Sequence, residues 1–314
     1  MSRALVFPGQ GSQKVGMGRA LAEAFAPARE VFEEVDDALS QNLSRLMFEG
    51  PDETLRLTEN AQPALMAVSL AVMRTLAADG RTIEALASHV AGHSLGEYSA
   101  LCAAGALSLA DTARLLKRRG LAMQRAVPVG EGAMAAILGL DIETVEEIAQ
   151  DAAGGDFVCA AANDNAPGQI VVSGHAAAVE RAIAIAREHG ARRAMQLPVS
   201  APFHCALMKP AAEEMRAALA EAAMAAPAVP VISNVSARPE TQPEAIRRLL
   251  VEQVTARVRW RESVLGFAAL GIDSATEIGA GKVLAGLVRR IDPDLAVASV
   301  ETPADLEAFV AALQ

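Results

Sequence analysis

Gly-His-Ser-Leu-Gly, at residues 92–96, sets Ser94 between two glycines where an apolar segment (89–91) gives way to a helix-compatible run (97–101). Glycine two residues away on either side lets the backbone turn sharply without a Cβ clash, and such a turn pushes the hydroxyl outward beside free N–H groups. Patterns of five residues also arise by chance, but the flanking segments favour a nucleophile here. The stretch therefore predicts a strand, a tight turn and a helix, with acyl chemistry through a covalent serine ester.

The composition is that of a well-packed globular protein. Of 314 residues, 52% are hydrophobic and 21% are charged, which excludes a disordered chain. The length allows one large domain, or a large domain that carries a smaller one. Aromatic residues make up only 3%, so the core must be built from Ala, Leu, Val and Met, and few rings are present for bases to stack on. We therefore expect no nucleic-acid partner.

The charge and the cysteines limit the partners further. The formal net charge is −10 and the pI is near 5.1, so an anionic partner would need a local cluster of Arg and Lys. Three cysteines, Cys102, Cys159 and Cys205, show neither paired nor metal-ligand spacing. We expect reduced thiols and no metal site.

The apolar segments predict a soluble cytoplasmic protein without membrane contact. The N-terminal apolar run is too short for a signal sequence and stops at Pro8. The longest apolar stretch, 63–73, falls far short of the length that crosses a bilayer.

Strand and helix patterns alternate near both ends of the chain, which favours a mainly parallel sheet flanked by helices. The turn-rich segment 128–132 is a plausible domain boundary, and after it the order becomes β-α-β-β-α-β, the ferredoxin-like unit. The expected strands of this unit are 133–140, 157–162, 169–173 and 193–199, its helices 141–155 and 176–189, and its central turn 163–168. The sequence thus predicts an α/β protein with a core formed by 1–127 and 200–314 and an inserted subdomain at 128–199.

A serine nucleophile needs a base within hydrogen-bonding reach, and the chain has five histidines. His204 lies in a loop after a strand and downstream of Ser94, which is the chain order of this type of sheet enzyme. Two interpretations of His204 have equal weight: it is the base, or it is a buried histidine whose hydrogen bonds are satisfied within the structure. The other four favour structural roles: His89, His93, His175 and His189. No carboxylate stands out as the third member of a triad, but a main-chain carbonyl can also fix an imidazole tautomer.

Arg119 interrupts the apolar stripe of a predicted helix, four residues after Leu115 and four before Met123. An arginine in such a stripe is costly unless an anion pairs with it. Two interpretations stay open: a structural salt bridge, or a guanidinium fork that awaits a substrate carboxylate.

Two glycine-rich segments invite nucleotide interpretations that the residues do not support. Pro-Gly-Gln-Gly (8–11) lacks the third glycine of a dinucleotide fingerprint, since Lys14 stands there. This segment can instead supply an N–H to an oxyanion, with the N–H of Leu95 as second donor. Gly-Ala-Gly-Lys (279–282) is followed by Val283 where a phosphate loop needs Ser or Thr, so it predicts a turn at the start of a helix.

Taken together, these residues resemble the malonyl-CoA:acyl carrier protein transacylases of type II fatty acid synthesis. The matching segments are Phe-Pro-Gly-Gln-Gly-Ser-Gln (7–13), Thr-Glu-Asn-Ala-Gln-Pro-Ala-Leu (58–65), Gly-His-Ser-Leu-Gly-Glu-Tyr-Ser-Ala (92–100), Arg-Gly (119–120), Gly-Ala-Met-Ala (132–135), Asn-Asp-Asn-Ala-Pro-Gly-Gln (163–169), His-Cys-Ala-Leu-Met (204–208) and Ile-Gly-Ala-Gly-Lys-Val-Leu (278–284). They follow the family's order over nearly the whole chain, so the resemblance is highly specific.

The resemblance implies a fold and a set of roles. The fold is an α/β-hydrolase-like core with an inserted ferredoxin-like subdomain. Ser94 would be the nucleophile and His204 the base, and Arg119 would bind the malonyl carboxylate. The remaining implied site residues are Gln10 and Leu95, whose N–H groups form the oxyanion hole; Gln253, at the position whose backbone carbonyl orients the histidine; Gln62, near the site; and Phe203, which supports malonyl preference. Leu95 stands where methylmalonyl enzymes tend to carry Gln.

The implied reaction is ping-pong transfer from malonyl-CoA to acyl carrier protein, with no metal or redox cofactor. We expect a monomer. Because the carrier is acidic, docking would need local cations, and the candidates are Lys117, Arg118, Arg192, Arg193, Arg289 and Arg290. A serine hydrolase acting on thioesters and an inert carrier-binding scaffold are the alternatives. The sequence leaves open whether the carrier serves fatty acid, polyketide or malonate-decarboxylase chemistry.

Overall fold

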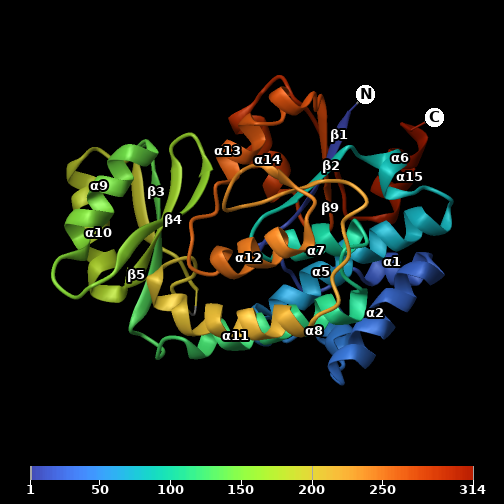
Figure 1. Ribbon diagram of the computed structural model, residues 1–314, viewed down its shortest axis with the longest axis horizontal. Helices are drawn as coiled ribbons and strands as arrows, with labels where there is room; N and C mark the ends of the chain where they lie inside the picture. Colours follow the sequence, from blue (N-terminus) through green and yellow to red (C-terminus); the bar gives the residue numbers. More distant parts are fainter. Residues whose placement is uncertain (1, 200, 314) are drawn as a thin grey trace.

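The computed structural model describes residues 2–199 and 201–313, and it divides into a larger and a smaller lobe (Figure 1). The larger lobe holds a six-stranded sheet of order β10-β9-β1-β2-β7-β8, in which β8 alone runs antiparallel to its neighbour. The bounds are β1 (Arg3–Phe7), β2 (His89–Gly92), β7 (Val231–Ile232), β8 (Pro239–Glu240), β9 (Ser274–Ile278) and β10 (Ala296–Val300). The mainly parallel sheet expected from the alternation of strands and helices is present.

Helices cover both faces of this sheet (Figure 1), which explains why the central strand β1 is apolar and buried from Ala4 to Phe7. Side chains of successive strand residues point to opposite faces. Leu5 and Phe7 of β1 accordingly join one core cluster, whereas Ala4 and Val6 join a second cluster with Trp260. The helices are α1 (Arg19–Ala24), α2 (Ala26–Leu39), α3 (Leu43–Glu49), α4 (Asp52–Arg56), α5 (Thr58–Ala78), α6 (Ile83–Leu86), α7 (Leu95–Ala103), α8 (Leu109–Arg125), α11 (Lys209–Glu221), α12 (Pro243–Gln253), α13 (Trp260–Leu265), α14 (Val283–Ile291) and α15 (Pro303–Ala311).

Helix α5 is longer than the apolar stretch 63–73 suggests. It has 21 residues, and by length and composition alone it could cross a membrane. Most of its residues are buried, because α2, α7 and α8 pack around it. A single helix of this kind is what the core of a soluble protein also contains, and its burial accounts for its apolar composition.

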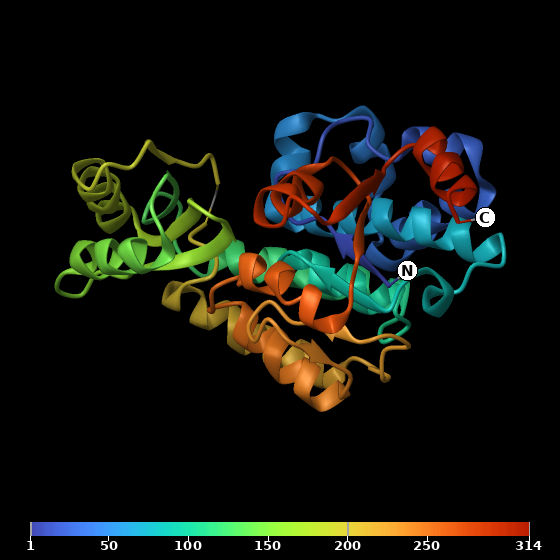
Figure 2. The same cartoon turned by 90° about the horizontal axis from the view of Figure 1, so that it is seen from above.

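The smaller lobe holds an antiparallel sheet of order β4-β5-β3-β6 with two helices on it, and Figure 2 shows the same lobe projecting from the larger one. The bounds are β3 (Gly132–Leu138), α9 (Ile142–Ala153), β4 (Cys159–Ala166), β5 (Gln169–His175), α10 (Ala176–Glu188) and β6 (Arg193–Gln196). This is the β-α-β-β-α-β order that the sequence predicts. The expected turn at 163–168 is partly wrong, since 163–166 continue β4 past two register shifts and only Pro167 and Gly168 turn.

Strand β4 also ties the smaller lobe to the larger one. The Val258 N–H donates to the Ala162 carbonyl at 2.9 Å, and the Val258 carbonyl accepts the Asp164 N–H at 2.9 Å. Nε of Arg261 donates to both carboxylate oxygens of the buried Asp164, at 3.0 Å to Oδ1 and 2.9 Å to Oδ2. We propose 128–199 as the inserted unit; Ser200, at its boundary, lies outside the described residues.

The segment 279–282 leads into helix α14, as expected for a helix-start turn. Glu277, at the end of β9, accepts the N–H of Leu284 at 3.1 Å and that of Ala285 at 2.8 Å. A carboxylate therefore already satisfies the N–H groups that a phosphate would need. Burial raises the pKa of Glu277 to about 7.

Candidate active site

Ser94 stands on the tight turn between β2 and α7 that the glycine spacing predicts. Its backbone has φ 54° and ψ −110°, a conformation that non-glycine residues rarely adopt. A Cβ at Gly92 would lie 1.9 Å from the carbonyl of Gly96, and one at Gly96 would lie 2.2 Å from the carbonyl oxygen of Phe7. Both positions therefore require glycine, and the close packing of β1, β2 and α7 holds the serine in place.

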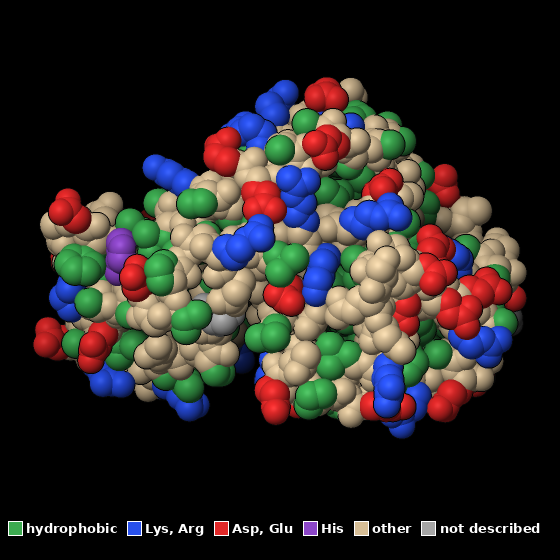
Figure 3. Space-filling view, turned by 90° about the horizontal axis from the view of Figure 1, so that it is seen from below, with side chains coloured by type: hydrophobic (Ala, Val, Ile, Leu, Met, Phe, Trp, Pro, Cys, Tyr) green, Lys and Arg blue, Asp and Glu red, His purple; other side chains and the backbone are tan. Residues whose placement is uncertain are grey.

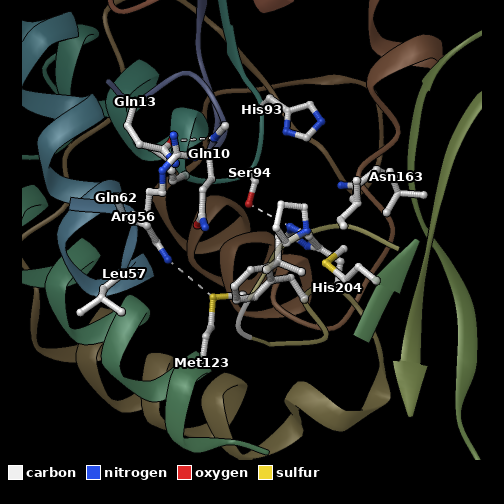
Figure 4. A pocket seen from close by; sticks show the side chains of 18 of the residues that line it. Gln10, Gln13, Arg56, Leu57, Gln62, His93, Ser94, Met123, Asn163 and His204 are labelled. Carbon is white, nitrogen blue, oxygen red and sulfur yellow. Dashed lines mark hydrogen bonds between the residues drawn. The ribbon is translucent and has the colours of Figure 1, made fainter. Parts of the chain in front are cut away.

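The serine faces a cleft of about 670 Å³ that both lobes line. Gln62 and Arg119 line it from the larger lobe, and Met134 and Asn163 from the smaller. Figure 3 shows a hollow in the surface between the two lobes, and Figure 4 shows Ser94 pointing toward His204 inside the pocket. The site is therefore built at the junction of the core and the inserted unit.

His204 forms two hydrogen bonds that fix its tautomer. Its Nε2 lies 2.8 Å from the Ser94 hydroxyl oxygen, and its Nδ1 lies 2.8 Å from the main-chain carbonyl oxygen of Gln253. A carbonyl only accepts, so Nδ1 carries the proton and Nε2 is left as an acceptor for the serine hydroxyl. Of the two interpretations of His204 from the sequence, the geometry favours the base.

The surroundings keep His204 uncharged. Burial, followed by the nearby positive charge of Arg119, lowers the pKa of His204 to about 3. The imidazole is therefore neutral at physiological pH and free to accept a proton.

The remaining histidines contact other groups, as expected for structural residues. His93 Nε2 bonds the Asn165 side-chain oxygen at 2.8 Å, which links the serine turn to β4. His175 Nδ1 accepts the Val158 N–H at 2.8 Å. The other two bonds are His189 Nδ1 to the Ile185 carbonyl oxygen at 2.9 Å and His89 Nδ1 to the Ser88 hydroxyl at 3.1 Å.

Arg119 is buried in α8, and its partners are neutral. Its guanidinium donates to the side-chain oxygen of Gln62 at 2.8 Å, to that of Gln253 at 2.9 Å and to the Ser94 hydroxyl oxygen at 3.1 Å. Over residues 2–199 and 201–313, no carboxylate lies within ion-pair distance of it. Burial lowers its pKa. The buried carboxylate of Glu97 attracts the guanidinium only from beyond ion-pair distance, so no anion pairs with it directly, which favours the substrate-fork interpretation over the salt bridge.

A chain of hydrogen-bonded polar side chains connects this arginine to the segment that follows β1. Gln62 donates to the Thr58 hydroxyl at 2.9 Å, and that hydroxyl donates to the side-chain oxygen of Gln10 at 2.9 Å. Gln10 and Gln62, which the resemblance implies near the site, thus lie in one network with Arg119.

The two predicted oxyanion donors come from the segment after β1 and from the first residue of α7. Leu95 is the first residue of α7, so its N–H has no acceptor within the helix. Gln10 follows β1, where Gly9 packs so closely that a Cβ would lie 2.7 Å from the His93 carbonyl oxygen. Gln10, Leu95 and Phe203 all line the cleft.

Two further site residues escaped the sequence analysis. Asn234 accepts the Ser94 N–H on its side-chain oxygen at 2.7 Å and donates to the Gly92 carbonyl at 2.6 Å. Glu97 is buried beneath the turn, and burial raises its pKa to about 7. Asn234 lies 140 residues beyond Ser94, so no local pattern connects them. Glu97 directly follows the quoted pentapeptide, and its charge in a buried helical turn was the available signal.

Several predicted docking cations already have partners. Lys117 approaches Glu59 at 3.4 Å and Arg118 approaches Glu214 at 3.3 Å. Arg289 donates to a main-chain carbonyl, and Arg290 donates to a side-chain amide. On the face drawn in Figure 3, basic and acidic side chains are interspersed. The carrier docking surface stays a prediction.

Comparison with known proteins shows which family this chain belongs to. The acyl transferase domain family matches residues 4–295. A malonyl CoA-acyl carrier protein transacylase of Bacillus subtilis is 46% identical over 311 residues, 99% of this chain and 97% of that protein. That of Escherichia coli K12 is 46% identical over 305 residues, 97% of each. The chain belongs to the malonyl CoA-acyl carrier protein transacylase family.

Solved structures of this family share the fold. An acyl-carrier-protein-S-malonyltransferase of Bartonella henselae is 58% identical with a TM-score of 0.97, and the match covers 100% of this chain and 99% of that one. A malonyl-transacylase in complex with a type II PKS acyl-carrier protein is 43% identical with a TM-score of 0.96, over 99% of this chain and 100% of that one. The predicted fold class, a parallel α/β core with a separate antiparallel unit, is confirmed.

Proposed function

We propose that this chain transfers malonyl groups from malonyl-CoA to the phosphopantetheine thiol of acyl carrier protein through a malonyl ester on Ser94. The observation that carries the proposal is the buried guanidinium of Arg119, which lies 3.1 Å from the candidate nucleophile and has neutral partners. A dicarboxylic thioester supplies the missing anion at its free end. Membership of the transacylase family supports the same substrate and acceptor.

The first half of the reaction acylates the serine. Nε2 of His204 takes the hydroxyl proton while the oxygen of Ser94 attacks the thioester carbonyl carbon. The N–H groups of Gln10 and Leu95 stabilise the oxyanion. The carbon–sulfur bond then breaks, the imidazolium returns its proton to the departing CoA sulfur, and the malonyl ester remains with its carboxylate on Arg119.

The second half transfers the malonyl group to the carrier. His204 accepts the proton of the phosphopantetheine thiol as the sulfur attacks the ester carbonyl carbon. Collapse of the second tetrahedral intermediate breaks the ester bond, and the proton returns from the imidazole to the oxygen of Ser94. Each half-reaction leaves the enzyme in its starting protonation state. The chain's own residues supply the nucleophile, the base and the charge that holds the substrate.

The fate of the malonyl ester on Ser94 distinguishes the proposed transferase from a thioester hydrolase. With malonyl-CoA alone, we expect one equivalent of free CoA per enzyme and then little more. Continued release should begin only when carrier protein bearing phosphopantetheine is added, and carrier protein lacking it is the control. Steady CoA release without any carrier would identify a hydrolase. An inert scaffold would give no release at all.

The lowered pKa of His204 has a consequence for the pH profile. Since that pKa is about 3, the base stays neutral from about pH 8 down to about pH 5. We expect kcat/KM for acylation by malonyl-CoA to show no fall that follows an ordinary imidazole pKa of about 6.5. The measurement uses quenched reactions at limiting substrate, in the wild type and in Glu97→Gln, where residue 97 cannot titrate. A fall in kcat/KM of about tenfold per pH unit below about pH 6.5 in both proteins would contradict a His204 base that stays neutral down to about pH 5.

A soluble cytoplasmic monomer stays the prediction of the sequence.

A further inference from the structure

Glu97 is a buried carboxylate that the catalytic steps above do not use. It lies in the first turn of α7, and 2% of the residue is exposed. Its Oε2 accepts the main-chain N–H of Asn234 at 2.9 Å and the side-chain N–H of Gln253 at 2.9 Å. A carboxylate at this depth is costly without such donors. Both donors belong to residues that contact Ser94, so the carboxylate lies directly behind the nucleophile.

The side-chain amide of Gln253 is held at both ends. Its Nε2 donates to Glu97 and, at 3.1 Å, to the main-chain carbonyl of Ser94. Its Oε1 accepts a guanidinium N–H of Arg119 at 2.9 Å. The two ends of an amide have nearly the same shape, so the surrounding donors and acceptors decide which end points where. In the reversed orientation, two donors would meet at Arg119 and two acceptors at Glu97.

We propose that Glu97 is the positioning residue that sets the orientation of the Gln253 amide and, through it, the place of the Arg119 guanidinium. The inference rests on the proposed malonyl transfer, because it concerns how the cation for the malonyl carboxylate is held. The length of the Glu97 side chain determines this role, because its Oε2 must lie within hydrogen-bonding distance of two donors at once.

The same oxygen also ties together two distant segments of the chain. Asn234 follows β7, and Gln253 ends α12. Asn234 in turn accepts the Ser94 N–H, and the main-chain carbonyl of Gln253 accepts from His204. The carboxylate therefore supports the nucleophile and the residue that orients the base.

The ionisation of Glu97 is secondary in this arrangement. Its pKa of about 7 means that both forms are present at neutral pH, and both keep an oxygen that accepts hydrogen bonds. Glu97 attracts Arg119 over a longer range, without a direct ion pair within the described part of the chain. Reach and charge are thus separable by substitution.

Two conservative variants separate them. Glu97→Gln keeps the reach and an acceptor oxygen but loses the charge, whereas Glu97→Asp keeps the charge and is one methylene shorter. The measurement is the ratio of Ser94 malonylation to acetylation rate constants, from quenched reactions with malonyl-CoA and acetyl-CoA. We expect E97Q to slow both acylations alike and to keep the ratio within about threefold of the wild type. E97D should lower the ratio by about tenfold, because the amide of Gln253 keeps only the Ser94 carbonyl as an acceptor and holds Arg119 less firmly.

Glu277 offers a matched control, since it too is a buried carboxylate that accepts two N–H groups. Glu277→Asp and Glu277→Gln should lower the melting temperature and leave the ratio at the wild-type value. The proposal is overturned if E97D keeps the wild-type ratio, or if E97Q loses as much of it as E97D. The wild type in the same assay tests the proposed function separately, since a wild type without a malonyl adduct would defeat the function itself.

Discussion

Replacing Ser94 by alanine should abolish the covalent acyl-enzyme and reduce malonyl transfer by a factor on the order of 10⁶, the scale seen when a serine nucleophile is removed. The substitution deletes the oxygen that lies 2.8 Å from Nε2 of His204 and 3.1 Å from the Arg119 guanidinium. Among the described residues that line the cleft, Ser94 is the only one with a hydroxyl group. Intact-mass spectrometry after incubation with malonyl-CoA is the measurement.

Ser99 is the matched control for this variant. It lies in α7, the helix that follows Ser94, but it is buried and is absent from the cleft lining. Ser99→Ala should therefore still form the adduct. A malonyl adduct on Ser94→Ala would exclude Ser94 as the nucleophile.

Replacing Arg119 by alanine should slow malonylation of Ser94 by a factor on the order of 10² to 10⁴, because a buried charge partner of the substrate carboxylate contributes about 3 to 5 kcal/mol. Acetyl-CoA has no carboxylate, so its reaction should lose far less. The two rates are compared in single-turnover reactions that are quenched and analysed by mass. The malonyl-to-acetyl preference should therefore collapse or reverse in the variant.

The variant Arg119→Lys distinguishes the contribution of the planar guanidinium geometry from that of the positive charge alone. A lysine keeps the positive charge but cannot bond Gln62, Gln253 and the substrate in the geometry of a planar guanidinium. We expect malonylation by this variant to lie between that of the wild type and that of Arg119→Ala. Equal losses for malonyl-CoA and acetyl-CoA in Arg119→Ala would show that the arginine supports the fold and does not bind the carboxylate.

The parts of the site that depend on local geometry could be predicted from the sequence. The turn around Ser94 follows from the glycines at 92 and 96, because only glycine fits where three segments pack within van der Waals contact. Arg119 was detectable because helical periodicity places it in an apolar stripe. The inserted antiparallel unit could be recognised from the order of its elements alone.

The parts that depend on contacts between distant segments could not. Glu97 and Asn234 meet beneath the turn from elements 137 residues apart, and the sequence holds no periodic signal for such a pair. The extension of β4 through 163–166 was missed because Asn, Asp and Pro favour turns. In the structure, the backbone of Val258 pairs with this segment and overrides that preference. The sequence also could not predict whether Arg119 forms an ion pair, because that depends on the positions of all nearby carboxylates.

The central claim is that the Arg119 guanidinium beside Ser94 selects a thioester with a free carboxylate. Its most direct test is the intact mass of the wild-type protein after brief incubation with equal concentrations of malonyl-CoA, methylmalonyl-CoA and acetyl-CoA, with peptide mapping of the modified residue. We predict that the malonyl adduct predominates and maps to Ser94. An acetyl adduct of equal abundance, or a malonyl group on another residue, would contradict the account.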